Sequence, residues 1–211
     1  DEHTSRGLGD VYKRQKKLIA YSSISHMGFV MLGISAGRYL SLEGAVIQMI
    51  NHGITSGALF MLVGFLYDRR HTRRISDFGG LKKSMPIYAS IFLFTSFASI
   101  GLPGLNGFVG EFMILMGSYP TFKVLTSVAA FGVVLAAIYM LWAYQRMFNG
   151  QLDNDENAVL SDLNSKELVA VGPLLALMLF IGIYPSFIES YVVQDVSVIY
   201  ESISNLIGVS Q

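Results

Sequence analysis

The sequence contains no cysteine among its 211 residues. Disulfide bonds, thiolate zinc sites and iron–sulfur clusters held by cysteine are therefore excluded within this chain. Charge is also scarce, because only 14% of the residues are charged, and the fifteen basic and fifteen acidic side chains cancel. A chain without net charge gives no electrostatic reason to bind nucleic acid. No signal peptide is recognisable, because residues 1–15 are polar and charged, which favours a loop or an extension there.

Apolar residues dominate what is present. They make up 52% of the chain, and the mean hydropathy is +0.49, which is typical of a membrane protein. Each of the apolar segments is long enough to cross ~30 Å of hydrocarbon at ~1.5 Å per residue. These segments are Leu18–Gly37, Gly44–Tyr67, Met85–Tyr119, Val124–Tyr144 and Leu168–Ile188. The pattern predicts an all-α polytopic membrane helix bundle with about five transmembrane helices.

The segment Met85–Tyr119 is too long for one straight span, and it is interrupted by glycines and a proline. Residues 84–110 carry no charged side chain, and Glu111 is the first ionisable group that follows. Unwound backbone at membrane depth is tolerated only inside protein or beside a wet cavity. We therefore predict one discontinuous helix, with a carboxylate just beyond its break that is a candidate for a proton path. The candidate break residues are Pro103, Gly104, Asn106 and Gly107.

Two histidines, His26 and His52, lie inside the first two segments with polar residues at helical spacing around them. Such a polar stripe should face other helices or water rather than lipid. The supporting polar residues are Ser22, Ser25, Gln48, Asn51, Thr55 and Ser56. Histidine titrates near neutral pH, so two histidines and one buried carboxylate suit a proton relay.

Three other interpretations of these residues remain open. Both histidines could stay neutral and only hydrogen-bond neighbouring helices, and Glu111 could be a structural carboxylate paired with a base or a backbone NH. The two histidines could also hold a haem from two helices, as membrane cytochromes do.

Basic residues are distributed unequally between the two sides of the expected bundle. Arg6, Lys13, Arg14, Lys16, Lys17, Arg69, Arg70, Arg73, Arg74, Lys82 and Lys83 lie on one side, against Arg38 and Lys123 on the other. The positive-inside rule then predicts a cytoplasmic N-terminus and a C-terminus on the outer side. In the tail, residues 189–211, apolar positions recur every three or four residues, which indicates either an interfacial amphipathic helix or a frayed end.

Several motifs resemble the antiporter-like membrane subunits of the proton-pumping NADH:quinone oxidoreductase (respiratory complex I), and most of all the chain M (chain 4) group. The resemblance covers residues 16–188 and excludes residues 1–15. The motifs are Lys16–Gly28 with its Ser-His-Met, Gly44–Gly53 with its His-Gly, Gly79–Leu81, Leu102–Phe112 with its Gly-Glu-Phe, and Gly182–Pro185.

The resemblance implies a larger subunit, built from two inverted repeats that each contain a discontinuous helix, of which this chain is the C-terminal part. It further implies that His26, His52 and Glu111 line a proton route, with the glutamate on the exit side. This chain would bind no redox cofactor, because NADH, FMN, iron–sulfur clusters and quinone would belong to partner subunits. Its partners would be the other membrane subunits of the enzyme and the lipid of the inner (plasma) membrane.

Two functions other than that of a translocase subunit remain as alternatives. A subunit of a multi-subunit cation/proton antiporter resembles the same motifs, and it would move protons in a sodium-dependent, NADH-independent way. A structural membrane scaffold fragment would use its polar residues only to hold helices together, so replacing Glu111 would leave proton flux intact.

Overall fold

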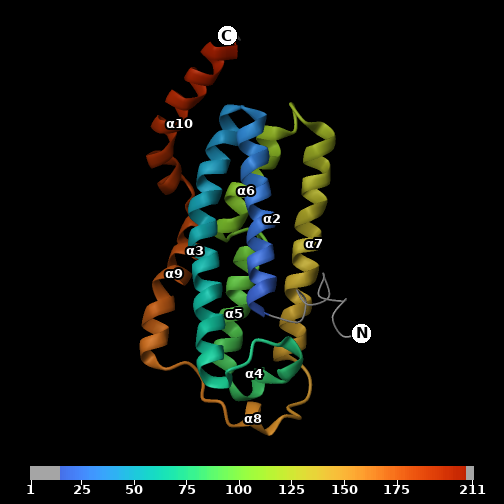
Figure 1. The fold of residues 1–211 in the computed structure, drawn as a ribbon. Coiled ribbons are helices and arrows are strands. Elements are labelled where there is room, and N and C mark those ends of the chain that lie inside the picture. The colour runs from blue at the N-terminus through green and yellow to red at the C-terminus, as the bar shows by residue number, and fades with distance from the viewer. Residues whose placement is uncertain (1–14, 208–211) are drawn as a thin grey trace.

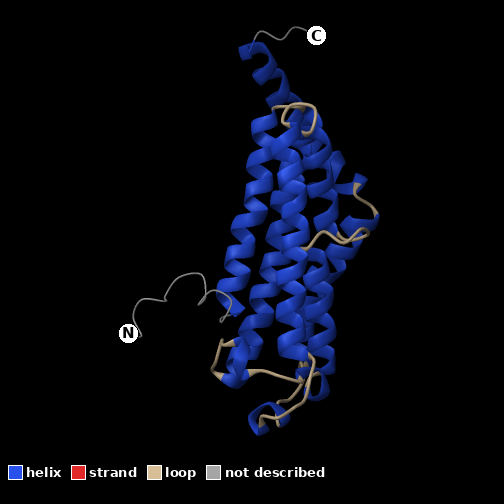
Figure 2. Ribbon diagram, turned by 90° about the vertical axis from the view of Figure 1, so that its right-hand side faces the viewer, coloured by secondary structure: helices blue, strands red, loops and turns tan. Residues whose placement is uncertain are grey.

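The computed structural model describes residues 15–207, which form helices and connecting loops without a strand (Figures 1 and 2). The helices are α2 (Gln15–Ala36), α3 (Tyr39–Arg70), η1 (Ile75–Asp77), α4 (Leu81–Ser84), α5 (Pro86–Ser99), α6 (Asn106–Ser118), α7 (Lys123–Phe148), α8 (Asp155–Ala158), α9 (Ser165–Ile183) and α10 (Ser186–Ile207). The expected N-terminal extension, residues 1–15, lies outside the described residues except for Gln15, where α2 begins.

Four helices of the described part, α2, α3, α7 and α9, are long and apolar enough to cross a membrane. They run roughly side by side along the long axis of the molecule (Figures 1 and 2). The shortest, α9, has 19 residues, which corresponds to about 28 Å at ~1.5 Å per residue. The predicted all-α membrane helix bundle is confirmed.

The remaining apolar segment is divided into the half-helices α5, with 14 residues, and α6, with 13. Each spans only about 20 Å, too short to cross the hydrocarbon alone. The connection, residues 100–105, contains Gly101 at φ 71° and Gly104 at φ 92°. Glycine adopts these left-handed angles without a steric penalty, which explains why the break occurs here. The predicted discontinuous helix is present.

The half-helix α6 lies at the centre of the bundle and packs against α2, α3, α7 and α9. Small residues allow α3 and α6 to approach closely. A Cβ added at Gly44 would lie 2.8 Å from the backbone nitrogen of Ile114, and one at Gly117 would lie 2.8 Å from the Cα of Ser41. Close contact through small residues is how helices associate in an apolar solvent. The same contact brings the polar residues of α3 and α6 together.

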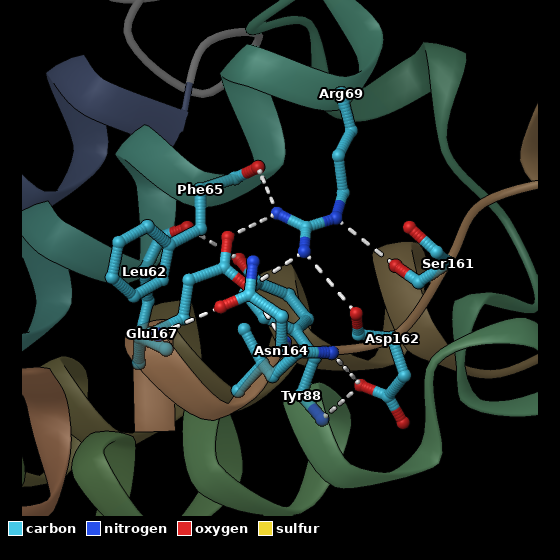
Figure 3. Close-up of polar contacts among 9 residues, drawn as sticks. Leu62, Phe65, Arg69, Tyr88, Ser161, Asp162, Asn164 and Glu167 are labelled. Carbon is cyan, nitrogen blue, oxygen red and sulfur yellow. Dashed lines mark hydrogen bonds and ion pairs between the residues drawn. The ribbon is translucent and has the colours of Figure 1, made fainter. Parts of the chain in front are cut away.

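At the end of the bundle where α3 ends and α9 begins, Arg69 joins the two helices (Figure 3). Its guanidinium forms a bidentate pair with Glu167, both N–O distances being 2.6 Å. It also donates to the backbone carbonyls of Phe65 (3.0 Å), Ser161 (3.0 Å) and Asp162 (3.2 Å). A planar guanidinium provides several donors in a fixed geometry, so one side chain fixes the loop before α9 against α3.

The same loop fixes the start of the half-helix α5. The Asp162 carboxylate accepts hydrogen bonds from the backbone NH groups of Ile87 (2.7 Å) and Tyr88 (2.9 Å) (Figure 3). A carboxylate at a helix N-terminus satisfies free NH groups and the positive end of the helix dipole. The Tyr88 hydroxyl donates to the carbonyl of Leu62 at 2.9 Å, which ties α5 to α3. The entry to the broken helix is therefore held firmly.

The tail forms the helix α10, which lies beside the first turns of α3 and extends past them (Figure 1). Val192 and Val196 of α10 are buried against Leu42 and Ile47 of α3. The predicted amphipathic pattern corresponds to this helix, and its apolar face contacts protein. That α10 lies at a membrane interface stays a prediction.

Candidate functional site

Glu111 and His26 form the centre of the site. Glu111 lies in the second turn of α6, His26 lies in the middle of α2, and their exposed fractions are 4% and 5%. The Nδ1 atom of His26 is 2.8 Å from Oε1 of Glu111. This distance is that of a charge-assisted hydrogen bond, so a proton can be shared between imidazole and carboxyl group.

Gln48 of α3 is the second partner of the same carboxylate oxygen. Its Nε2 donates to Oε1 of Glu111 at 3.3 Å. Glu111 is thus held from two helices, α2 and α3. The sequence predicts His26 and Glu111 in one proton relay and Gln48 as a supporting polar residue, but it does not predict these direct hydrogen bonds.

His52 lies next to His26, with 5.7 Å between the ring centroids. It is half-buried, whereas His26 is buried. The structure therefore brings together the three candidate proton-path residues, which come from three different helices. This proximity is an observation of geometry, and their role in proton transfer stays a prediction.

Asn106, the first residue of α6, is fully buried and connects the break to α3. Its backbone carbonyl accepts from Nδ2 of Asn51 at 2.7 Å, and its own Nδ2 lies 3.2 Å from the carbonyl of Asn51. Its Nδ2 also donates to Oγ1 of Thr55 at 3.2 Å. Buried polar groups need such partners in an apolar surrounding. The polar residues of α3 therefore satisfy the backbone and side chain at the start of the second half-helix.

A cavity of about 10 Å³ lies between the histidines and the break. Its wall includes His26, His52 and Asn51, with Gly107 on the side of the break. Three buried polar atoms of its lining residues lack a hydrogen-bond partner among the described residues: Nε2 of His26, Oδ1 of Asn51 and Oε1 of Gln48. A polar space of this size with several polar partners suits one water molecule. Such a water could connect the two imidazoles.

Glycines at the break allow its backbone to approach the site. An ideal Cβ on Gly101 would lie 2.6 Å from Oε2 of Glu111. A Cβ on Gly107 would overlap the carbonyl oxygen of Ala98, the last turn of α5. The predicted break residues Pro103 and Gly104 lie on the exposed part of the connection. Only glycine fits at the two close positions.

The remaining predicted polar residues differ in their position. Ser22 is buried one turn before His26, and its Oγ accepts from the hydroxyl of Tyr139 on α7 at 2.7 Å. Ser25 is exposed and does not point toward the cluster. Ser56 donates to the carbonyl of His52 in its own helix at 2.6 Å. Tyr139 has no distinguishing signal in the sequence, because it is one tyrosine within an apolar span.

The arrangement suits proton transfer better than the other chemistry considered. Glu111 and His26 can exchange a proton directly, and the cavity with room for one water adjoins both His26 and His52. Within residues 15–207 no group of three or more His, Cys, Asp or Glu side chains is placed to hold a metal ion. A space of about 10 Å³ beside the histidines is much smaller than a haem, so the geometry does not fit the haem alternative.

Comparison with known families and proteins gives consistent results. A family model described as NADH:quinone oxidoreductase/Mrp antiporter, TM, matches residues 11–139. The chain is 48% identical over 180 residues to NADH-quinone oxidoreductase subunit M of Rhodobacter capsulatus, which covers 84% of this chain and 35% of that protein. It is 46% identical over 170 residues to subunit M of Pseudomonas aeruginosa, which covers 81% of this chain and 33% of that protein. The chain thus spans about a third of the length of the curated relatives it matches.

Solved structures include similar chains. One chain of respiratory complex I from Thermus thermophilus with bound NADH is 32% identical, with a TM-score of 0.81 over 89% of this chain and 39% of that chain. A chain of the Mrp complex from Dietzia sp. DQ12-45-1b is 17% identical, with a TM-score of 0.79 over 90% of this chain and 43% of that chain. At that identity, the second similarity concerns the fold alone.

Proposed function

The chain belongs to the NADH:quinone oxidoreductase/Mrp antiporter transmembrane family, and from this premise we propose that it carries part of a proton path across a membrane. The observation that supports the proposal most directly is the buried pair His26–Glu111 beside a break in a membrane helix. An ionisable pair inside a membrane bundle is a candidate for ion or proton transfer. The chain would be the C-terminal part of a larger subunit that works inside a multi-subunit NADH:quinone oxidoreductase.

The proposed path passes from His52 to His26 and then to Glu111. In the tautomer whose Nδ1 carries the proton, His26 donates to Glu111, while its Nε2 faces the cavity with a free lone pair. A proton that arrives at Nε2 from the cavity allows the Nδ1 proton to move to the carboxylate. One imidazole thereby transfers a proton between two sides without changing its net charge.

Neighbouring polar residues would position these three groups. Gln48 donates to the carboxylate of Glu111, and Asn51 and Thr55 hold Asn106 at the start of α6. NADH, FMN, iron–sulfur clusters and quinone would be bound by partner subunits. The enzyme's redox reaction would take place there, and this chain would contribute translocation alone.

The proposed location is the inner (plasma) membrane. Basic residues of the segment between α3 and α5 lie at one end of the bundle, which supports a cytoplasmic position for that end. The start of α2 would face the cytoplasm, and α10 would lie on the outer side.

The competing function is that of a subunit of a cation/proton antiporter complex, which the similarity to the Mrp fold supports. The NADH-linked function is favoured because the chain is 48% identical to a subunit M. Proton movement that requires sodium and does not require NADH would reverse this preference.

The test uses inverted membrane vesicles that contain the full-length subunit in its complex. We expect Glu111→Gln to reduce NADH-driven acidification at least about tenfold, because general acid–base groups contribute ~10²-fold or more. Glu201→Gln, which alters an exposed carboxylate of α10, is the matched control and should pump normally. NADH oxidation with an artificial electron acceptor reports assembly. Normal acidification by the assembled Glu111→Gln variant would contradict the proposal and favour the scaffold alternative.

A further inference from the structure

Glu43 is a second carboxylate buried in a membrane-spanning helix, with 7% of its surface exposed. Within the described residues, Glu43 and Glu111 are the acidic side chains in the buried class. Glu43 lies in the second turn of α3, five residues before Gln48, which donates to Glu111. That spacing corresponds to about 7.5 Å along the helix. The proposed path through Glu111 does not use Glu43.

The position of Glu43 is a junction between helices. Its neighbours in sequence, Leu42 and Ile47, belong to an apolar cluster with Val192 and Val196 of α10. Met113 of α6 packs against the same cluster, and Gly44 contacts α6 directly. Glu43 is therefore enclosed where α3, α6 and α10 meet. This junction lies at the end of the bundle away from the loop that holds the basic residues 69–83 (Figure 1).

Among the described residues, no neighbour compensates the charge of Glu43. Within residues 15–207 no hydrogen bond to its carboxylate is formed, and neither a lysine nor an arginine pairs with it. Glu189, in the first turn of α10, is next to Ile188, which packs against this cluster, and Glu189 carries the same sign of charge as Glu43. Tyr39, one turn earlier on α3, is a titratable group near it, and Tyr200 of α10 packs edge-on against Tyr39 in the same cluster. The α6 residues at this junction, Val109 and Met113, are apolar.

Two like charges in an apolar junction repel each other, and burial disfavours an unpaired carboxylate. A single proton bound by the two carboxyl groups removes both difficulties. Acidic side chains of this kind therefore hold a proton reversibly, and a small change of their surroundings releases it.

We propose that Glu43 and Glu189 together bind one proton that comes from Glu111 and release it at the α10 end of the bundle. This inference rests on the function proposed above and extends it to the outlet of the path. In the transfer, the O–H bond at Glu111 breaks and an O–H bond at Glu43 forms, with water molecules carrying the proton between them. The O–H bond at the pair then breaks, and the proton passes to the outer water.

The test compares Glu43→Gln, Glu43→Asp and Glu201→Gln in the full-length subunit within its complex. We expect Glu43→Gln to lower NADH-driven acidification several-fold while NADH oxidation with an artificial acceptor is retained. Glu43→Asp, which keeps an acid, should recover most of the activity, and Glu201→Gln should pump normally. If Glu43 had only a structural role, pumping would not require an acidic side chain at position 43.

Glu189→Gln provides a second measurement if Glu43→Gln fails to assemble. Glu189 is half-buried, so its replacement leaves the core intact. Without the like charge beside it, Glu43 holds its proton less firmly. We therefore expect the dependence of pumping on the pH of the outer side to shift to lower pH.

The outcomes separate this inference from the proposed function. If Glu111→Gln abolishes pumping and both Glu43→Gln and Glu189→Gln behave like the unmodified protein, the outlet proposed here is wrong and the function stands. If Glu111→Gln also pumps normally, the proposed function itself is wrong.

Discussion

The close approach of the two half-helices at Gly107 allows a sharp test of how the site is built. Gly107 is the second residue of α6, and an ideal Cβ at this position overlaps the carbonyl oxygen of Ala98 in α5. That oxygen belongs to the backbone and cannot rotate away, so Gly107→Ala must push α5 and α6 apart. The matched control is Gly57→Ala in α3, because an added Cβ there meets no atom within 4 Å.

Three contributions set the change in the free energy of unfolding that Gly107→Ala causes. Overpacking a tight contact destabilises by about 1–3 kcal/mol. Displacing the start of α6 also weakens the bonds of Asn106 to Asn51 and Thr55, each worth about 1 kcal/mol. The better helix propensity of alanine returns about 1 kcal/mol. The net loss for Gly107→Ala is about 2–4 kcal/mol, or on the order of 100-fold in the folding equilibrium. Gly57→Ala has none of these losses and is expected only to gain stability from the better helix propensity of alanine.

The assay is the thermal stability of the purified complex that contains the full-length subunit, measured together with NADH-driven acidification. We expect Gly107→Ala to unfold several degrees lower and to pump poorly, because Gly107 lines the cavity beside the two histidines. Gly57→Ala should match or slightly exceed the unmodified protein. Equal stability and equal pumping of the two variants would refute the close contact between the half-helices, and with it the geometry of the site.

Two further predictions concern contacts outside the proposed proton path. Replacing either partner of the Arg69–Glu167 pair, as Arg69→Met or Glu167→Gln, should destabilise the complex by about 1–3 kcal/mol, whereas the double variant should lose less than the sum. Thermal unfolding of the three variants measures this coupling, and strict additivity would contradict a direct pair. Tyr139→Phe removes the donor to the buried Ser22 and should lower stability by about 1 kcal/mol. Its proton pumping should remain within twofold of normal, and a collapse of pumping would add Tyr139 to the proposed path.

Several features of this protein could be predicted from local sequence alone. Apolar segments of membrane length predict helices because the backbone must satisfy its own hydrogen bonds in lipid. Glycines and a proline at Gly101–Gly107 predict the break, since they either favour left-handed angles or remove an NH group. His26, His52 and Glu111 could be identified because an ionisable group is rare in such a segment. These inferences depend only on a residue and its neighbours along the chain.

Only the tertiary structure decided which polar groups meet. Glu111 contacts His26 across 85 positions of sequence, and Tyr139 contacts Ser22 across 117. The basic segment 69–83 indicates topology by its charge, and the structure shows in addition that Arg69 is bound to Glu167, which lies 98 positions later. Such pairs depend on how helices pack, and no local pattern specifies them.

The orientation of Ser25 illustrates the physical reason. It lies next to His26 in sequence but is exposed, whereas Ser22 is buried one turn earlier. In a soluble helix, hydrophobicity distinguishes the inner face from the outer face. In a membrane helix, lipid and protein neighbours are both apolar, so hydrophobicity reveals the span and leaves the facing direction undetermined. The sequence by itself determined which segments are long and apolar enough to cross a membrane, and the packing of α2, α3 and α6 determined which of their polar residues come together in the candidate site.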